Sequence, residues 1–143
     1  MRPVHLLITA FLLLQCSQTN AQSNSPVVVV VADASAVTSL SLQQVQDIFL
    51  GYSQFFPDGS PVIAVDQPEN SESYIEFYAS ALDMTPAQVR SHWARMTFTG
   101  RARPLRSVTN DAALIELLQQ DVRIIGYLAR RAVNQHIKVV FEP

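Results

Sequence analysis

This 143-residue sequence is poor in cysteine, glycine and charge. Its single cysteine excludes an internal disulfide bond, and its four glycines are scattered singly, so no glycine-rich loop is present to cradle a phosphate group. Basic residues number 10 and acidic residues 12, and this balance gives no sign of a nucleic-acid partner. Charged residues make up 15% and hydrophobic residues 48%, which excludes a disordered chain and is typical of one folded domain.

The first 21 residues have the features of a secretory signal peptide. Arg2 supplies a positive charge, and the apolar run His5–Leu14 (HLLITAFLLL) is too short to cross a bilayer, which needs about 20 apolar residues. Small residues then end at Ala21, ahead of a cleavage position before Gln22. The sequence therefore predicts a protein of the periplasm or the external medium.

Two other interpretations of this leader stay open. The apolar run could stay uncut as a membrane anchor. Alternatively, Leu13-Leu14-Gln15-Cys16 resembles the motif at which bacterial lipoproteins are lipidated on cysteine, although Gln15 stands where that motif has Gly, Ala or Ser.

Cleavage before Gln22 would leave residues 22–143 as a single domain without any thiol. A chain without unpaired thiols suits an oxidising compartment. It also has neither a cysteine nucleophile nor a cysteine metal ligand. About 120 residues can bury about two-thirds of their unfolded surface, so one core is feasible without disulfides.

Catalytic and metal-binding patterns are scarce in this domain. Its two histidines, His92 and His136, lie in different expected elements and lack the spacing of a zinc site. The segment 51–55 (GYSQF) resembles the nucleophile elbow of hydrolases, but it lacks the second glycine and follows a helix. We therefore expect neither an enzyme, nor a bound metal, nor a cofactor.

Apolar strands alternate with helices along the domain. Short apolar runs predict strands at 27–32, 62–65, 124–128 and 137–141. Capping residues predict helices that begin at Ser41, at Thr85 and at Asn110 or Asp111, and a further helix covers about 73–82. Leu42 and Ile75 are expected on the buried faces of their helices. This order predicts an α/β fold with a mainly parallel sheet flanked by helices.

Two loops are candidates for ligand binding. The loop 66–73 leads from a strand end to a helix N-terminus, where ligands and anions bind in α/β sheets, although its polar residues could simply cap the helix. The loop 101–106 (RARPLR) carries arginines that match oxyanions, although it could equally be a solvated run of charge. The candidate ligand-binding residues are Gln67, Asn70, Ser71, Ser73, Arg101 and Arg103.

Four segments, in this order, resemble the phosphate-binding periplasmic receptors of ABC transporters. They are Leu42–Gly51 (LQQVQDIFLG), Val62–Tyr78, Asn110–Ala113 (NDAA) and Ile125–Tyr127 (IGY). The resemblance covers most of 39–140. It implies the type II periplasmic-binding fold, in which two lobes hold phosphate between them. This chain is too short for both lobes, so the resemblance implies a single lobe.

The sequence departs from these receptors at the phosphate loop. The family has an arginine near the position of Asp66, and a Ser-Gly-Thr loop where this chain has Pro68–Glu72 (PENSE). Carboxylates at 66, 69 and 72 would each repel a bound phosphate by a few kcal/mol at about 4 Å and an effective dielectric near 20.

Two classes of function follow from the resemblance. The first is an exported binding module for phosphate or a similar oxyanion, with Arg101 and Arg103 helping the Asn70 loop. The second is an envelope interaction protein that kept the fold but lost the anion site, with another envelope protein or a second copy of itself as partner. Neither class involves nucleic acid, and no membrane span is expected after cleavage.

Overall fold

The structure is a computed structural model that describes residues 26–143. The expected signal peptide, its cleavage position and Cys16 lie outside the described residues. Among the helices between residues 26 and 143, none combines the length and the apolar character that crossing a membrane requires.

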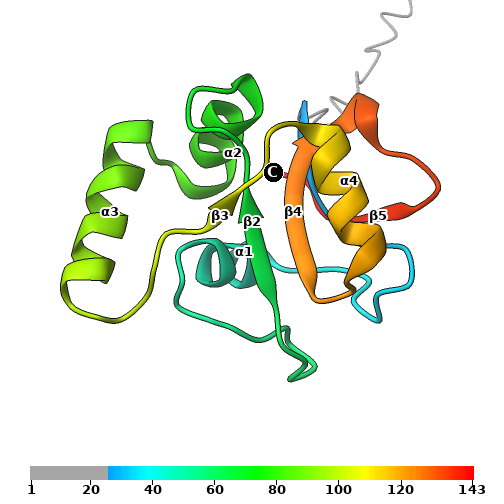
Figure 1. Cartoon of the computed structure of the whole chain (residues 1–143), viewed down its shortest axis with the longest axis horizontal. Helices are drawn as coiled ribbons and strands as arrows, with labels where there is room; N and C mark the ends of the chain where they lie inside the picture. The colour runs from blue at the N-terminus through cyan, green and yellow to red at the C-terminus, as the bar shows by residue number, and fades with distance from the viewer. Residues whose placement is uncertain (1–25) are drawn as a thin grey trace, which may run out of the picture.

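A five-stranded sheet forms the centre of the fold (Figure 1), in the order β3-β2-β4-β1-β5. The strands are β1 (Val27–Ala32), β2 (Ile63–Asp66), β3 (Arg106–Ser107), β4 (Ile124–Ala129) and β5 (Ile137–Phe141). β2 pairs in parallel with β3 and β4, whereas β1 pairs antiparallel with β4 and β5. Of these five strands, four therefore share one direction and β1 runs against them. The predicted α/β fold with a mainly parallel sheet is confirmed.

Strand β1 is buried on both faces of the sheet, as its unbroken apolar sequence predicts. Val27, Val29 and Val31 pack into one core, and Val28 and Val30 pack into the other. The same alternation continues in the neighbouring strand β4. The run of valines thus indicates burial correctly, but it carries no signal that this strand is the antiparallel one.

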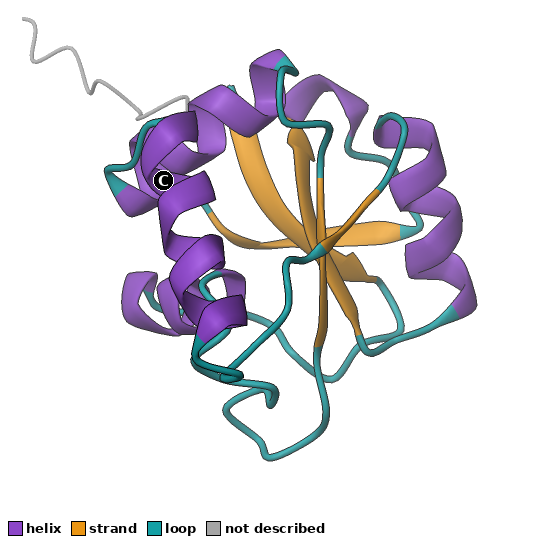
Figure 2. Ribbon diagram, turned by 60° about the vertical axis from the view of Figure 1, so that its left-hand side comes forward, coloured by secondary structure: helices purple, strands orange, loops and turns teal. Residues whose placement is uncertain are grey.

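Helices cover both faces of the sheet (Figure 2). Helices α1 (Leu42–Phe49), α2 (Glu72–Leu82) and α3 (Pro86–Phe98) contribute to the core on one face. Helix α4 (Asp111–Gln120) covers the other face through Leu114 and Leu118. A short 3-10 helix, Arg130–Ala132, links β4 to β5. In Figure 1, α3 stands at one end of the molecule, away from the sheet.

The helices begin where the capping residues predict. Ser41 and Thr85 each form a capping box with a glutamine three residues later, at the starts of α1 and α3. The Asn110 side chain accepts a hydrogen bond of 2.9 Å from the backbone N–H of Ala113, so Asn110 rather than Asp111 caps α4.

Three sequence-based expectations about these elements are wrong. Leu42 and Ile75 are 46% and 47% exposed, because the packed faces of α1 and α2 leave them outside the core. The end of the expected basic loop, at Arg106, forms strand β3. This strand is only two residues long and pairs with the end of β2, so its sequence carries no periodic pattern.

Helix α4 packs closely against the sheet at Gly126. A Cβ atom added to this residue of β4 would lie 2.6 Å from Cδ1 of Leu114 on α4. Glycine therefore lets α4 pack directly on the sheet.

Candidate functional site

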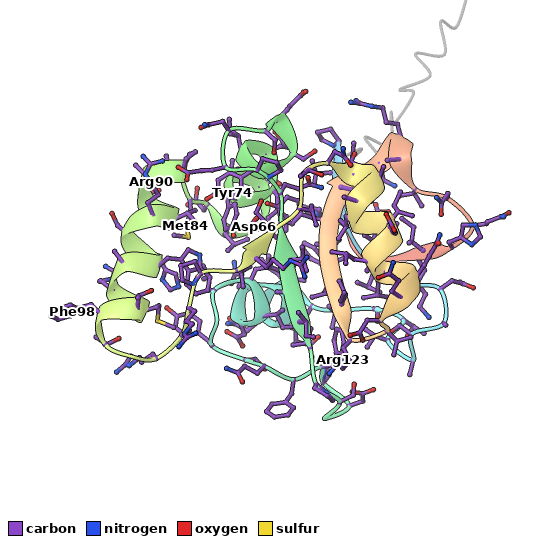
Figure 3. All side chains as sticks on the ribbon, viewed as in Figure 1. Asp66, Tyr74, Met84, Arg90, Phe98 and Arg123 are labelled. Atoms are coloured by element: carbon purple, nitrogen blue, oxygen red, sulfur yellow. The ribbon has the colours of Figure 1, made fainter. Side chains whose placement is uncertain are left out.

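A cleft of about 620 Å³ opens beside the carboxyl ends of β2 and β3. Its apolar wall comes from α3 and the loop that follows, and includes Val89, Trp93, Phe98 and Leu105. Its polar end includes Asp66, Gln67, Glu69 and Arg90. Figure 3 shows Asp66 and Tyr74 beside the end of β2, with Arg90 across from them on α3. Ligands of open α/β sheets bind at this end of the strands.

The carboxylate of Asp66 is the centre of a buried hydrogen-bond network. Its Oδ2 accepts a hydrogen bond of 2.9 Å from the hydroxyl of Tyr78 on α2. Its Oδ1 accepts one from the hydroxyl of Tyr127 on β4, and another of 3.1 Å from the backbone N–H of Gln67. Three donors from three parts of the fold therefore already surround a carboxylate that belongs to the protein itself.

Burial raises the pKa of Asp66 to about 6, from its usual value of 3.8. The hydrogen bonds from Tyr127, Tyr78 and Gln67 act in the opposite direction, since they stabilise the charged form. The negative charge of Glu69 raises the pKa slightly further. At neutral pH Asp66 is therefore mostly ionised, and its charge lies at the polar end of the cleft.

Glu69 forms an exposed ion pair with Arg90 at the rim of the cleft. Such exposed pairs contribute little to stability, about 0 to 1 kcal/mol. The pair nevertheless matters for the charge of the rim. Because Arg90 is already paired with Glu69, it offers no unbalanced positive charge to a ligand.

Gln67 is buried, and its side chain joins β2 to two other elements. Its amide Nε2 donates to Oδ1 of Asp111, at 2.8 Å, and to the backbone carbonyl of Tyr127, at 2.9 Å. Both amide protons of this candidate residue are thus directed to protein acceptors at the start of α4 and in β4.

The other residues of the predicted loop lie at the start of α2. Ser71 is the N-cap, and its hydroxyl accepts a hydrogen bond of 3.2 Å from the backbone N–H of Tyr74. Asn70 is exposed and Ser73 half-buried. The described residues that line the cleft include Gln67 and Glu69 but not Asn70, Ser71 or Ser73.

Arg101 and Arg103 line a second cavity, of about 710 Å³. The loop between α1 and β2 contributes Ser53 and Gln54 to the same lining. The two cavities adjoin, because Trp93, Thr97 and Leu105 line both of them. The structure therefore brings Arg101 and Arg103 together, but next to Ser53 rather than next to Asn70.

Sequence reasoning missed the tyrosines that bind Asp66 and the indole of Trp93 in the cleft wall. Tyr78 and Tyr127 are both fully buried. A buried tyrosine needs a hydrogen-bond partner for its hydroxyl, and this requirement was the available signal. The partner lies 12 residues away for Tyr78 and 61 for Tyr127, and no local pattern links residues so far apart.

Comparison with solved structures identifies the fold. No protein-family model and no curated protein matches the sequence. Over 80% of its length, the chain is similar to a phosphate ABC transporter substrate-binding protein with bound phosphate from Clostridium perfringens (TM-score 0.64, 15% identity). It is also similar to an ABC-type phosphate transport receptor from Vibrio cholerae (0.63, 15%) and to PstS from Borrelia burgdorferi (0.61, 13%), again over 80% of its length.

The chain spans less than half of these structures, namely 44%, 45% and 46% of their chains. At identities of 15% or less, the similarity is one of fold. The expected resemblance is confirmed at that level: the described part of the chain has the fold of a single lobe of a phosphate-transport receptor.

Proposed function

We propose that this chain is an exported solute-binding protein whose ligand is phosphate or a similar small oxyanion. The observation that carries the proposal is the pair of arginines, Arg101 and Arg103, that line one cavity in a fold shared with phosphate receptors. Guanidinium groups match oxyanions in shape and charge, and they donate two parallel hydrogen bonds to them.

The arginine cavity suits an oxyanion better than the cleft at the end of β2. An anion in that cleft would meet the charges of Asp66 and Glu69, and Arg90 is already paired. The cavity beside Arg101 has polar groups from Ser53 and Gln54, and its described lining contains no carboxylate.

The start of α2 is the second place where an oxyanion could bind, through Asn70, Ser71 and Ser73. The first N–H groups of a helix have no partner within the helix, and its dipole favours negative charge. However, Glu72 already brings a negative charge to the first turn of α2. Substitutions at Asn70 and Arg101 therefore distinguish the two places, because each should weaken phosphate binding only if the anion binds beside that residue.

Calorimetric titration of phosphate into the refolded chain, freed of carried-over ligand, tests the proposal. Arg101→Gln and Arg103→Gln should each weaken binding about tenfold or more, since a hydrogen bond to a charged group contributes about 1.5 to 3 kcal/mol. Asn70→Ala should leave the affinity unchanged. The matched control is Arg131→Gln, which removes an exposed arginine outside both cavities.

Saturable binding that depends on Asn70 but not on Arg101 would move the site to the start of α2. Absence of heat at millimolar phosphate, with protein shown to be folded, would contradict oxyanion binding altogether.

The alternative, an interaction module without a solute, is favoured by the Asp66 network. The donors from Tyr78, Tyr127 and the backbone of Gln67 already bind an internal carboxylate. An external anion at the end of β2 would have to compete with it. A protein partner or a second copy of the chain would then use the surface of the lobe instead.

A further inference from the structure

Half of the basic residues of the chain lie in one segment that contains no acidic residue. Between Met84 and Asn110 there are five arginines and neither aspartate nor glutamate, whereas the whole chain has a net charge of −2. This segment comprises α3, the loop after it and β3, and we name it the basic arm. The rest of the chain has 12 acidic and five basic residues and therefore carries a net negative charge.

Four arginines of the basic arm are exposed and form no ion pair with another residue between 26 and 143. Arg90, near its start, is held by Glu69. The ion pairs between residues 26 and 143 leave out the other arginines of the arm, which are all exposed: Arg95, Arg101, Arg103 and Arg106. Their charges are therefore free to meet an anionic partner.

Phe98 is the last residue of α3, and in the sequence it lies between Arg95 and Arg101. Its side chain is 93% exposed, the highest value among the large exposed apolar residues of the described chain. Figure 3 shows Phe98 pointing outward from the outer end of the arm, away from the sheet. Burial of a phenylalanine side chain is strongly favourable, so a partner that covers Phe98 would gain affinity.

We propose that the basic arm docks on an anionic lipid surface, with Phe98 inserted at the level of the headgroups. Aromatic side chains favour the membrane interface, and arginines near an anionic membrane are attracted to its charged lipids. The acidic remainder of the chain is repelled by the same surface, so the charge distribution directs the arm toward the membrane.

The shape of the arm favours a lipid surface over an acidic protein. A stable protein interface buries about 800 Å² on each side around an apolar core. The end of the arm offers a single aromatic side chain that projects outward between charged residues. Insertion into a soft headgroup layer needs no complementary pocket, whereas a protein would need one.

Co-sedimentation with lipid vesicles tests this proposal. Residues 22–143 are suitable, because the sheet and both cores lie within the described residues and the apolar leader cannot contribute. We expect binding to vesicles of phosphatidylcholine with phosphatidylglycerol, and little binding to phosphatidylcholine alone. Raised salt should weaken the binding, because the interaction is largely electrostatic.

Substitutions separate insertion from charge attraction. Phe98→Ala should weaken vesicle binding about tenfold. Arg95→Gln, which lies outside both cavities described above, should weaken it about fivefold. The matched controls are Phe55→Ala, which removes another exposed phenylalanine, and Arg131→Gln, and both should bind as the unmodified chain does.

Several results would overturn the proposal. Equal binding to neutral and anionic vesicles would show that charge attraction does not drive the binding. Undiminished binding by the Phe98→Ala variant would show that Phe98 does not insert. Release of a variant that lacks both Arg101 and Arg103 by inorganic phosphate, but not by chloride at equal ionic strength, would show recognition of phosphate groups rather than of a surface. Binding to immobilised polyglutamate without binding to vesicles would assign the arm to an acidic protein.

Discussion

The hydroxyl of Tyr78 donates a hydrogen bond of 2.9 Å to Oδ2 of Asp66, and this bond joins α2 to the end of β2. The hydroxyl of Tyr127 binds the other oxygen and joins β4 to the same carboxylate. The charged form of Asp66 raises the pKa of both tyrosines further above their usual value, which burial has already raised. Both hydroxyls therefore stay protonated and remain donors throughout the ordinary pH range.

The buried Asp66 should make the stability of the protein depend on pH. The pKa of Asp66 is about 6 in the folded chain, whereas its usual value is 3.8. Between pH 3.8 and pH 6, folding of the chain is therefore accompanied by uptake of a proton. The contribution of Asp66 to the free energy of unfolding is thus fully present below about pH 4 and is lost as the pH rises through 6, by about 2 to 3 kcal/mol.

Asp66→Asn should remove this contribution. Urea denaturation of the unmodified chain and of the variant, at several pH values between 4 and 8, measures this contribution. The other titratable groups are the same in both proteins, so their effects cancel in the difference between the two free energies of unfolding. A difference that does not change with pH would contradict the raised pKa of Asp66. Tyr78→Phe, which removes one hydrogen bond to the charged form, should extend the loss to higher pH.

A methyl group at position 126 should push α4 off the sheet. Because the Cβ of Gly126→Ala would lie 2.6 Å from Leu114, we expect a loss of about 1 to 3 kcal/mol in the free energy of unfolding. Leu114→Val, made in the same chain, should recover part of this loss. Thermal unfolding of the two single variants and the double variant checks this, and strictly additive effects would mean that the two residues do not clash.

Ser71 should act as a helix cap and not as a phosphate ligand. Ser71→Ala should lower the free energy of unfolding by about 1 kcal/mol, whereas Ser71→Gly should lower it by only a few tenths. Both variants lack the hydroxyl, so both should bind phosphate as the unmodified chain does. A parallel loss of phosphate affinity in both would show that the hydroxyl touches the ligand.

The leader should be cleaved before Gln22 when the whole sequence is produced in a bacterium. Intact-mass spectrometry of the protein from the periplasmic fraction should give the mass of residues 22–143. A mass that includes Cys16 with attached acyl chains would support the lipoprotein interpretation, and an uncleaved mass would support an anchor.

The elements with local signals could be predicted from the sequence. A helix cap such as Ser41 or Thr85 acts through a hydrogen bond to a residue three positions away, so a short stretch of sequence contains the whole signal. The burial of β1 likewise follows from its own side chains. The direction of β1, in contrast, depends on partners about 100 residues away, at Gly126 and Val139.

The candidate site was harder to predict for the same reason. The resemblance to phosphate receptors suggested that Arg101 and Arg103 help the Asn70 loop to bind an oxyanion. The place of Arg101 depends on how α3 packs, and in the folded chain Arg101 lines a cavity with Ser53 of the α1–β2 loop. The internal partner of the Asp66 carboxylate, Tyr127, is supplied by a strand that is adjacent only in the folded sheet.

The position of β1 also determines when the chain can fold. β1 is the first strand of the described chain, yet both of its neighbours, β4 and β5, are among the last elements of the sequence. A growing polypeptide therefore cannot close the sheet until Ile137–Phe141 has been synthesised, and contacts so distant along the chain make folding slow.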